Sequence, residues 1–331
     1  MLNSPSRRNL LFGSAALALA APHVARAAAR IIKLGHNSVE TSQYGQGCQT
    51  LADAAARHPD LVNVIKVEVH GNAELGDELA MLNDCRAGAI DMMAGVTSVA
   101  GKLCPEIGML DVPFVFKDVE RGRAAFDGAT GEEYAALLKA QGIHLVGWLE
   151  NGLRHMTSNR LIREPKDMLG LKLRVLQSQV AIDSFRAIGA KAEPLAFNLV
   201  HEALRTGQFE AQENPIATVE AIKLYEVQKY LCLTGHTYSA GMVIASPDLL
   251  EDLTQKQLTA LRECARRGTG KSREVASGAE RDGVGRLRAA GMTVIADVDK
   301  EAFAKAARPN LVAMGATFGA DRMERLISAA G

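Results

Sequence analysis

The chain has 331 residues, of which 47% are hydrophobic, 23% charged and 5% aromatic. This composition is typical of a soluble α/β protein, and it excludes intrinsic disorder and collagen-like repeats. Basic and acidic residues both number 38, so the charge balance gives no reason to expect a nucleic acid or an anionic membrane as a partner. A chain of this length is near the limit of a single hydrophobic core, and two lobes are therefore expected.

Residues 1–27 have the pattern of an export signal. Arg7-Arg8 precedes an apolar run over residues 13–21, and Ala25-Arg26-Ala27 has the small-x-small form that a signal peptidase needs. The apolar run is too short to span a bilayer. The arginine pair followed by leucines resembles a twin-arginine signal, which exports folded proteins, and a general secretory signal is the alternative. We therefore expect a mature protein that begins near residue 28 and works in the periplasm.

The hydrophobic pattern after the export signal alternates between strands and helices. Apolar residues with a period of two predict strands, and apolar residues on one helical face predict helices. The strand–helix–strand–helix–strand order predicts a parallel sheet with right-handed crossovers. In the first half, the expected strands are Ile31–Gly35, Val62–His70, Ile90–Ala94 and His144–Glu150, and the expected helices are Ser42–Arg57, Asp77–Ala87, Val119–Phe126 and Glu132–Gln141.

A second unit is expected to begin near Gly152. A long charged region over Thr254–Arg288 has helical periodicity, and no Pro/Ser-rich linker separates the two halves. We therefore expect two lobes joined by several chain crossings with a hinge between them. In this half the expected strands are Arg154–Thr157, Lys172–Val175, Ala190–Pro194 and Ala211–Glu213, and the further helices are Val180–Ile188, Val200–Thr206, Thr218–Val227, Asp299–Ala307 and Asp321–Ala329.

The sequence contains no local signature of an enzyme. The patterns G-x-S-x-G, H-E-x-x-H and the P-loop are absent, and no histidine pair has metal-ligand spacing beside a carboxylate. We expect no catalytic residue, no cofactor and no metal site, with an exported hydrolase or isomerase that uses Cys and His as the alternative class. The five cysteines are far apart, which favours buried thiols, and one disulfide is the alternative; they are Cys48, Cys85, Cys104, Cys232 and Cys264.

Arginine and amide side chains at predicted strand ends are the candidate ligand contacts. Arg174 lies at the end of an apolar strand, Arg154 lies within the stretch 151–159, and Asn214 directly precedes Pro215. Ligands of open parallel sheets bind beyond the carboxyl ends of strands. An arginine at such a position can pair with a carboxylate through two parallel hydrogen bonds.

These residues lie in stretches that resemble one known family. NGLRHMTSNR and PKDMLGLKLRV within 151–175, QENP at 212–215 and KLYEVQKYLCLTGH at 223–236 are similar to hallmark stretches of the solute-binding proteins of tripartite ATP-independent periplasmic (TRAP) transporters, the DctP family. Shorter matches fall at 74–76 and 89–91, and the resemblance spans nearly all of 31–327. Chance is therefore excluded as its origin.

The resemblance implies an α/β, two-lobed periplasmic-binding-protein fold of type II-like form. Mixed sheets would carry helices on both faces, and a cleft would lie between the lobes. We expect residues 28–152 plus about 239–279 to form lobe I, and residues 153–238 plus about 280–331 to form lobe II.

The resemblance also implies roles for individual residues. The main carboxylate clamp falls on Arg174, a second arginine on Arg154, and the asparagine of QENP on Asn214. Asn37 resembles a ligand-contacting position, and Phe197 resembles a residue that lines the cleft. The candidate set is completed by Glu74, His236 and Thr97.

The implied function is capture of a small organic acid between two closing lobes, followed by delivery to TRAP permease subunits in the membrane. The protein itself would not be membrane-embedded, would need no ATP site, and is expected to be a monomer, with a dimer as the alternative. The stretches at 157–159 and 236–239 favour a sugar acid or hydroxy acid. A C4-dicarboxylate-binding protein and a ligand sensor for a periplasmic signalling receptor are alternatives. The sialic-acid branch of the family carries a Glu near 95–97, which this chain lacks.

Overall fold

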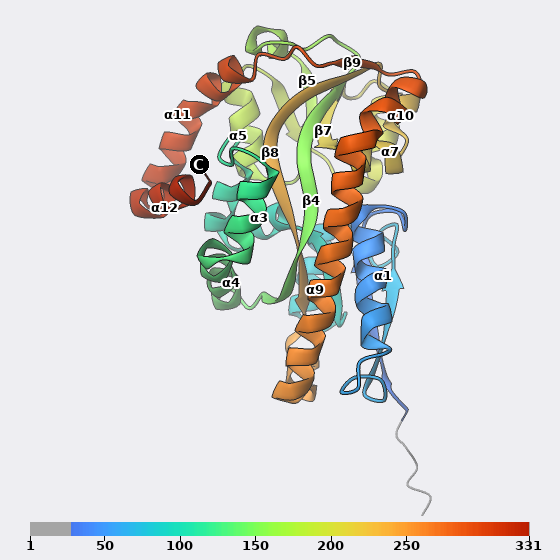
Figure 1. Cartoon of the computed structure of the whole chain (residues 1–331). Helices are drawn as coiled ribbons and strands as arrows, with labels where there is room; N and C mark the ends of the chain where they lie inside the picture. Colours follow the sequence, from blue (N-terminus) through green and yellow to red (C-terminus); the bar gives the residue numbers. More distant parts are fainter. Residues whose placement is uncertain (1–27, 331) are drawn as a thin grey trace, which may run out of the picture.

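The computed structural model describes residues 28–330, so the expected export signal at 1–27 lies outside the described residues. The described chain forms two lobes, one above the other in Figure 1. Lobe I is built from β1 (Arg30–His36), α1 (Gln43–Ala55), β2 (Ile65–His70), α2 (Glu78–Arg86), β3 (Met92–Val96), α3 (Val119–Asp127) and α4 (Ala129–Ala140). Lobe II is built from β5 (Lys172–Val175), α5 (Gln179–Ala187), β6 (Lys191–Pro194), α6 (Val200–Arg205), β7 (Ala211–Pro215), α7 (Ile216–Ala221) and β9 (Thr293–Ile295).

Two long strands pass through both lobes. They are β4 (His144–Ser158) and β8 (Tyr230–Ala245), which run side by side along the molecule in Figure 1. One hydrogen-bonded sheet results, with the strand order β2-β1-β3-β8-β4-β7-β5-β6, and β9 pairs with β8. β1 pairs in parallel with β2 and β3, as the sequence predicts, but β8 is antiparallel to both β3 and β4. The sheet is therefore mixed and continuous between the lobes.

The chain does not break near Gly152, so the prediction of separate strands over 144–150 and 154–157 is wrong. Gly152 has φ +121°, and the β4–β8 register shifts between Glu150 and Gly152. A glycine in this conformation marks a β-bulge inside a strand, and the bulge bends the strand without ending it. The expected helix over 218–227 is shorter than predicted, because α7 ends at Ala221 and Lys223 adopts a left-handed conformation.

A long helical segment lies along β4 and connects the lobes (Figure 1). After α8 (Pro247–Asp252), it comprises α9 (Gln255–Gly278), a π-helical turn (Ala279–Gly283) and α10 (Val284–Ala289). The chain ends with α11 (Lys300–Phe318), which continues through Pro309, and α12 (Ala320–Ala330). The expected lobe division put 280–331 in lobe II, whereas α12 packs against α3, with Arg322 Nε 2.9 Å from Glu133 Oε1 of α4.

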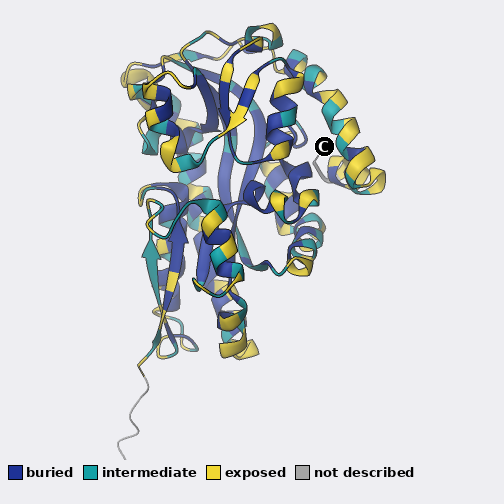
Figure 2. Cartoon of the chain, turned by 180° about the vertical axis from the view of Figure 1, so that it is seen from behind, coloured by how far each residue is buried: buried dark blue, intermediate teal, exposed yellow. Residues whose placement is uncertain are grey.

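The hydrophobic core lies on both sides of the sheet in each lobe. Strands at the centre are buried, while exposed residues gather on the outer faces of the helices (Figure 2). All five cysteines are buried free thiols, and each packs in one of these apolar clusters. This arrangement confirms the interpretation of the cysteines as small core residues.

Candidate functional site

A small polar cavity lies between the two lobes, where several strands end. Both lobes and the shared strand β4 contribute to its wall. The lining residues are Asn37, Ser38, Tyr44, Glu78 and Val96 from lobe I, Asn151 and Arg154 from β4, and Arg174, Leu176, Phe197, Asn214 and Thr218 from lobe II. Five of the eight residues that the sequence singled out therefore meet in one cavity.

Arg174 supplies a buried positive charge that has no carboxylate partner among residues 28–330. It stands near the end of β5 with 3% exposure, and its Nε and Nη2 donate to the Leu195 carbonyl at 3.0 and 2.6 Å. Burial lowers the pKa of Arg174 to about 10, because the charged form has lost its water. A guanidinium held in this way is suited to pair with an anion that enters the cavity.

Arg154 differs from Arg174 because its charge is already neutralised. Its Nε donates to Glu213 Oε2, and its Nη2 donates to Glu213 Oε1 at 2.9 Å and to the Glu213 carbonyl at 2.5 Å. Burial alone would raise the pKa of Glu213, but the Arg154 charge and the hydrogen bonds from His236 and Arg154 hold it at about 2. Arg154 therefore lines the cavity as half of a buried ion pair.

A chain of side-chain amides and hydroxyls holds Asn214. Its Nδ2 donates to Gln212 Oε1 at 2.5 Å, and Gln212 Nε2 donates to Thr157 Oγ1 at 2.9 Å. This chain fixes the Asn214 side chain at the end of β7 and leaves its carbonyl oxygen free of a hydrogen bond to the described residues. Asn37 lies at the end of β1, and Phe197 gives the cavity an apolar wall.

Three expected contacts, Glu74, His236 and Thr97, do not line the cavity. Glu74 is exposed in the turn before α2 and pairs with His70 at 3.2 Å. His236 lies behind the ion pair, with Nε2 3.2 Å from Glu213 Oε2. Thr97 is buried and donates to the Ala240 carbonyl at 3.2 Å.

Glu78 is a cavity residue that the sequence analysis missed. Asp77 caps α2 by accepting from Leu79 N and Ala80 N, and the next residue, Glu78, accepts from Val96 N at 3.0 Å. Burial raises the pKa of Glu78 to about 7, and its hydrogen bond and the two arginines offset only part of that effect. In the sequence, Glu78 could have been identified from the acidic pair Asp77-Glu78 at the start of the predicted helix.

Asn151 and Tyr44 were also missed. Asn151 accepts from Gln43 Nε2 at 3.1 Å and donates to Ser239 Oγ at 3.1 Å, which fixes its amide beside the cavity. Its signal is its place three residues before Arg154 in the same motif. Tyr44, in the first turn of α1, has no motif that could have identified it.

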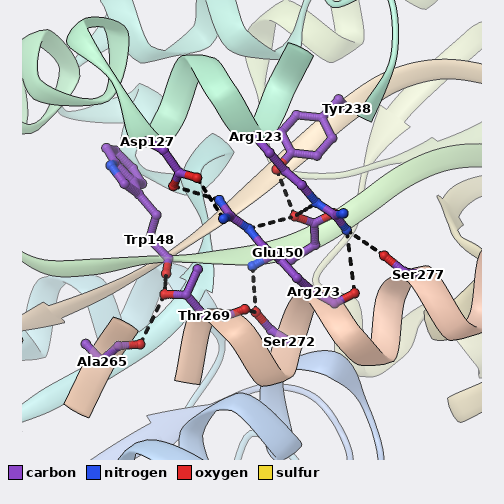
Figure 3. A network of polar contacts seen from close by, with 10 residues as sticks. All are labelled: Arg123, Asp127, Trp148, Glu150, Tyr238, Ala265, Thr269, Ser272, Arg273 and Ser277. Atoms are coloured by element: carbon purple, nitrogen blue, oxygen red, sulfur yellow. Dashed lines mark hydrogen bonds and ion pairs between the residues drawn. The ribbon is translucent and has the colours of Figure 1, made fainter. Parts of the chain in front are cut away.

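A buried ion cluster fixes the segment of β4 directly before Asn151. Glu150 is 1% exposed and accepts from Arg123 Nη2 at 2.9 Å and from Tyr238 Oη at 2.9 Å, while its amide donates to Ser272 Oγ (Figure 3). Arg273 of α9 lies beside the same carboxylate and also pairs with Asp127 of α3 at 2.8 Å (Figure 3). The cluster joins α3 and α9 to both crossing strands.

Over residues 28–330, no helix combines the length and the apolar character needed to cross a bilayer. Within the same range, no group of three or more His, Cys, Asp or Glu side chains is arranged to hold a metal ion.

Two α/β lobes that enclose a polar cavity with an unneutralised arginine define a solute-binding protein. The family described as bacterial extracellular solute-binding protein, family 7 (DctP), matches residues 34–316, and the chain belongs to this family. The resemblance seen in the sequence motifs is thereby confirmed.

Relatives and a solved structure agree with this assignment. A solute-binding protein of Verminephrobacter eiseniae is 33% identical, over 92% of this chain and 90% of its own. The 2,3-diketo-L-gulonate-binding periplasmic protein YiaO of Escherichia coli is 31% identical, over 87% of this chain and 88% of its own. A TRAP periplasmic solute-binding protein from Polaromonas sp. JS666, bound to D-erythronate, has a TM-score of 0.87 and 32% identity, covering 90% of this chain and 98% of its own. The two-lobed fold is confirmed by this match.

Proposed function

We propose that the protein captures a sugar acid or another hydroxy acid in the interlobe cavity and delivers it to the membrane permease subunits of a TRAP transporter. The observation that carries this proposal is the contrast between the two buried arginines. Arg154 is paired with Glu213, whereas Arg174 faces the cavity without a carboxylate partner in the described chain. A ligand carboxylate supplies the missing partner, and lobe closure strengthens the pair by excluding water.

The polar lining supports a ligand that carries hydroxyl groups. Amides and hydroxyls of Asn37, Asn151, Asn214 and Thr218 face the cavity together with the Glu78 carboxyl. Such groups satisfy hydroxyls, whereas the ionised form of Glu78 opposes a second carboxylate. Two relatives are described as binding acids of this kind, D-erythronate and 2,3-diketo-L-gulonate.

The proposal also includes where the protein works and the absence of a chemical reaction on its ligand. The protein works in the periplasm after export by the signal at 1–27, by the twin-arginine route, and it releases its ligand unchanged. It acts as a monomer and has no catalytic role, in keeping with a family whose members bind solutes for transport.

The test is calorimetric titration of the mature protein, residues 28–331, with D-erythronate, D-gluconate and succinate. Replacing Arg174 by Lys keeps the charge but removes the planar fork, so we expect the Kd of the best acid to rise tenfold or more, about 1.4 kcal/mol. The matched control is Arg163→Lys, because Arg163 forms an exposed ion pair with Asp297 at 2.9 Å. An unchanged Kd in Arg174→Lys would refute the clamp, and tighter binding of succinate than of either hydroxy acid would favour the C4-dicarboxylate alternative.

A further inference from the structure

We propose that the Tyr44 hydroxyl determines specificity by forming a hydrogen bond with a hydroxyl group of the bound acid. The inference rests on the proposed function and extends it. It identifies one residue of lobe I that recognises the hydroxyl groups of the ligand. Arg174 of lobe II would hold the carboxylate, so the two lobes would recognise different parts of one molecule.

The first reason is that the Tyr44 hydroxyl is buried without a partner. Tyr44 is 5% exposed and lines the cavity, and its Oη forms no hydrogen bond with residues 28–330. A buried hydroxyl is nearly always satisfied in a folded protein. A ligand hydroxyl in the cavity would satisfy it, since each hydroxyl can donate one hydrogen bond and accept others.

The second reason is that the position of the Tyr44 ring is fixed by the fold. Ser42 caps α1 by accepting from Gly45 N at 3.1 Å, and Gln43 donates to Thr218 Oγ1 at 3.0 Å and to the Asn151 carbonyl at 3.0 Å. The ring lies directly against Gly241 of β8. A Cβ there would stand 2.4 Å from Tyr44 Cε1 and 2.9 Å from its Oη. The hydroxyl is therefore positioned before a ligand arrives, which lowers the entropic cost of binding.

The third reason concerns charge. Tyr44 shares the cavity with the Glu78 carboxyl, and the two are close enough for Glu78 to raise the phenol pKa further above its ordinary value, in addition to the larger effect of burial. The phenol therefore stays neutral at physiological pH. A neutral hydroxyl beside an acidic group suits a ligand hydroxyl better than a second carboxylate. The ligand class that fits is a monocarboxylate with hydroxyls remote from its carboxylate.

The test compares a hydroxy acid with an acid of the same length that lacks hydroxyls. The probes are D-erythronate and butyrate, with D-gluconate as a longer hydroxy acid, and their Kd values come from competition calorimetry on residues 28–331. We expect Tyr44→Phe to weaken the tighter of the two hydroxy acids about tenfold while butyrate changes less than twofold. Thermal unfolding confirms that the variant is folded.

The matched control is Tyr134→Phe. Tyr134 is also buried, at 1% exposure, and its hydroxyl has no hydrogen-bond partner among residues 28–330, but it lies in the lobe I core and does not line the cavity. All three Kd values should stay unchanged in this control. Equal losses for butyrate and the hydroxy acids in Tyr44→Phe, or no loss for either hydroxy acid, would overturn the assignment while leaving the proposed function intact. If neither hydroxy acid binds the parent protein, the proposed function fails, and the role of Tyr44 fails with it.

Discussion

At the scale of single residues, Glu78 combines burial with proximity to two cationic side chains. Its pKa of about 7 means that its charge changes within the physiological pH range, although Arg174 and Arg154 favour the ionised form and Asp77 opposes it. An ionised Glu78 repels a second carboxylate in the cavity, and a protonated Glu78 does not. The selectivity of the site should therefore depend on pH.

The resulting prediction concerns succinate. Its binding should be strongest below the pKa of Glu78 and should weaken roughly tenfold as the pH rises through 7, from 6.5 to 8.5, because the protonated fraction of Glu78 falls about tenfold or more over this interval. D-Erythronate should change much less. Calorimetric titration at several pH values measures both profiles, and Glu78→Gln should make the succinate profile flat. A succinate affinity that does not vary with pH in the parent protein would contradict this role for Glu78.

The candidate residues divide into those that sequence reasoning could find and those that it could not. Arg174 and Asn214 stand at the ends of predicted strands inside recognisable motifs, so their meeting follows from the rule that ligands bind at strand ends. Tyr44 and Glu78 lie in the first turns of helices. Which side chain of a first turn faces the cavity depends on how the helix packs against the rest of the protein. For Tyr44, the decisive contact is Gly241, almost two hundred residues away, and no local pattern encodes that contact.

At the scale of elements, the long helical segment is fastened differently to each lobe. The α9 part lies close against α1, since a Cβ on Gly268 would stand 2.6 Å from the Gly47 carbonyl oxygen. The α10 part is fastened to α7 by Arg286 and Glu220, at 2.6 and 2.8 Å. The π-helical turn at 279–283 lies between these two attachments, and such turns are frequent at functional sites.

Two glycines of α9 make a matched test of the α1–α9 contact. Gly268→Ala should lower the free energy of unfolding by about 1–3 kcal/mol, because the added methyl group meets backbone atoms that can move only with their helix. Gly270→Ala, two residues away, meets nothing within 4 Å and should raise it by about 0.5–1 kcal/mol through higher helix propensity. Urea unfolding measures both values. Equal changes in the two variants would show that the close approach does not limit stability.

Most short elements could be predicted because each has its own hydrophobic period and its own cap or turn signal. The crossing strands were harder to predict, because β4 contains the Gly152 bulge and β8 is buried on both faces along most of its length. A continuously buried strand shows no alternation of apolar and polar residues. These two strands make the sheet mixed, because β8 runs antiparallel to β3 and β4. The hydrophobic pattern predicted a parallel sheet, and only the family resemblance implied a mixed one.

At the scale of the whole molecule, β4 and β8 make the two lobes mechanically dependent on each other. The first half of β4 pairs with β8 beside β3, and its second half pairs with β7 in lobe II. Each lobe therefore uses part of the same two strands to complete its core. Independent domains joined by a tether would share no strand.

We expect residues 28–331 to unfold in a single cooperative transition. The fluorescence of Trp148, the only tryptophan, reports on β4 in lobe I, and far-ultraviolet circular dichroism reports on the whole chain. The two denaturation curves should coincide. A ligand present at 100 times its Kd should raise the free energy of unfolding by about 2.7 kcal/mol, and both curves should shift by the same amount. Two separate transitions would show that the lobes fold independently.

The position of β8 also affects how the chain folds while it is being made. β3 and β4 are complete by residue 158, yet the strand that lies between them in the sheet consists of residues 230–245. Until that strand is synthesised, both neighbours have unpaired edges, which are prone to pair with other chains. The sheet of the nascent protein therefore stays incomplete until residue 245 has left the ribosome, and its unpaired edges are exposed for most of the time that synthesis takes.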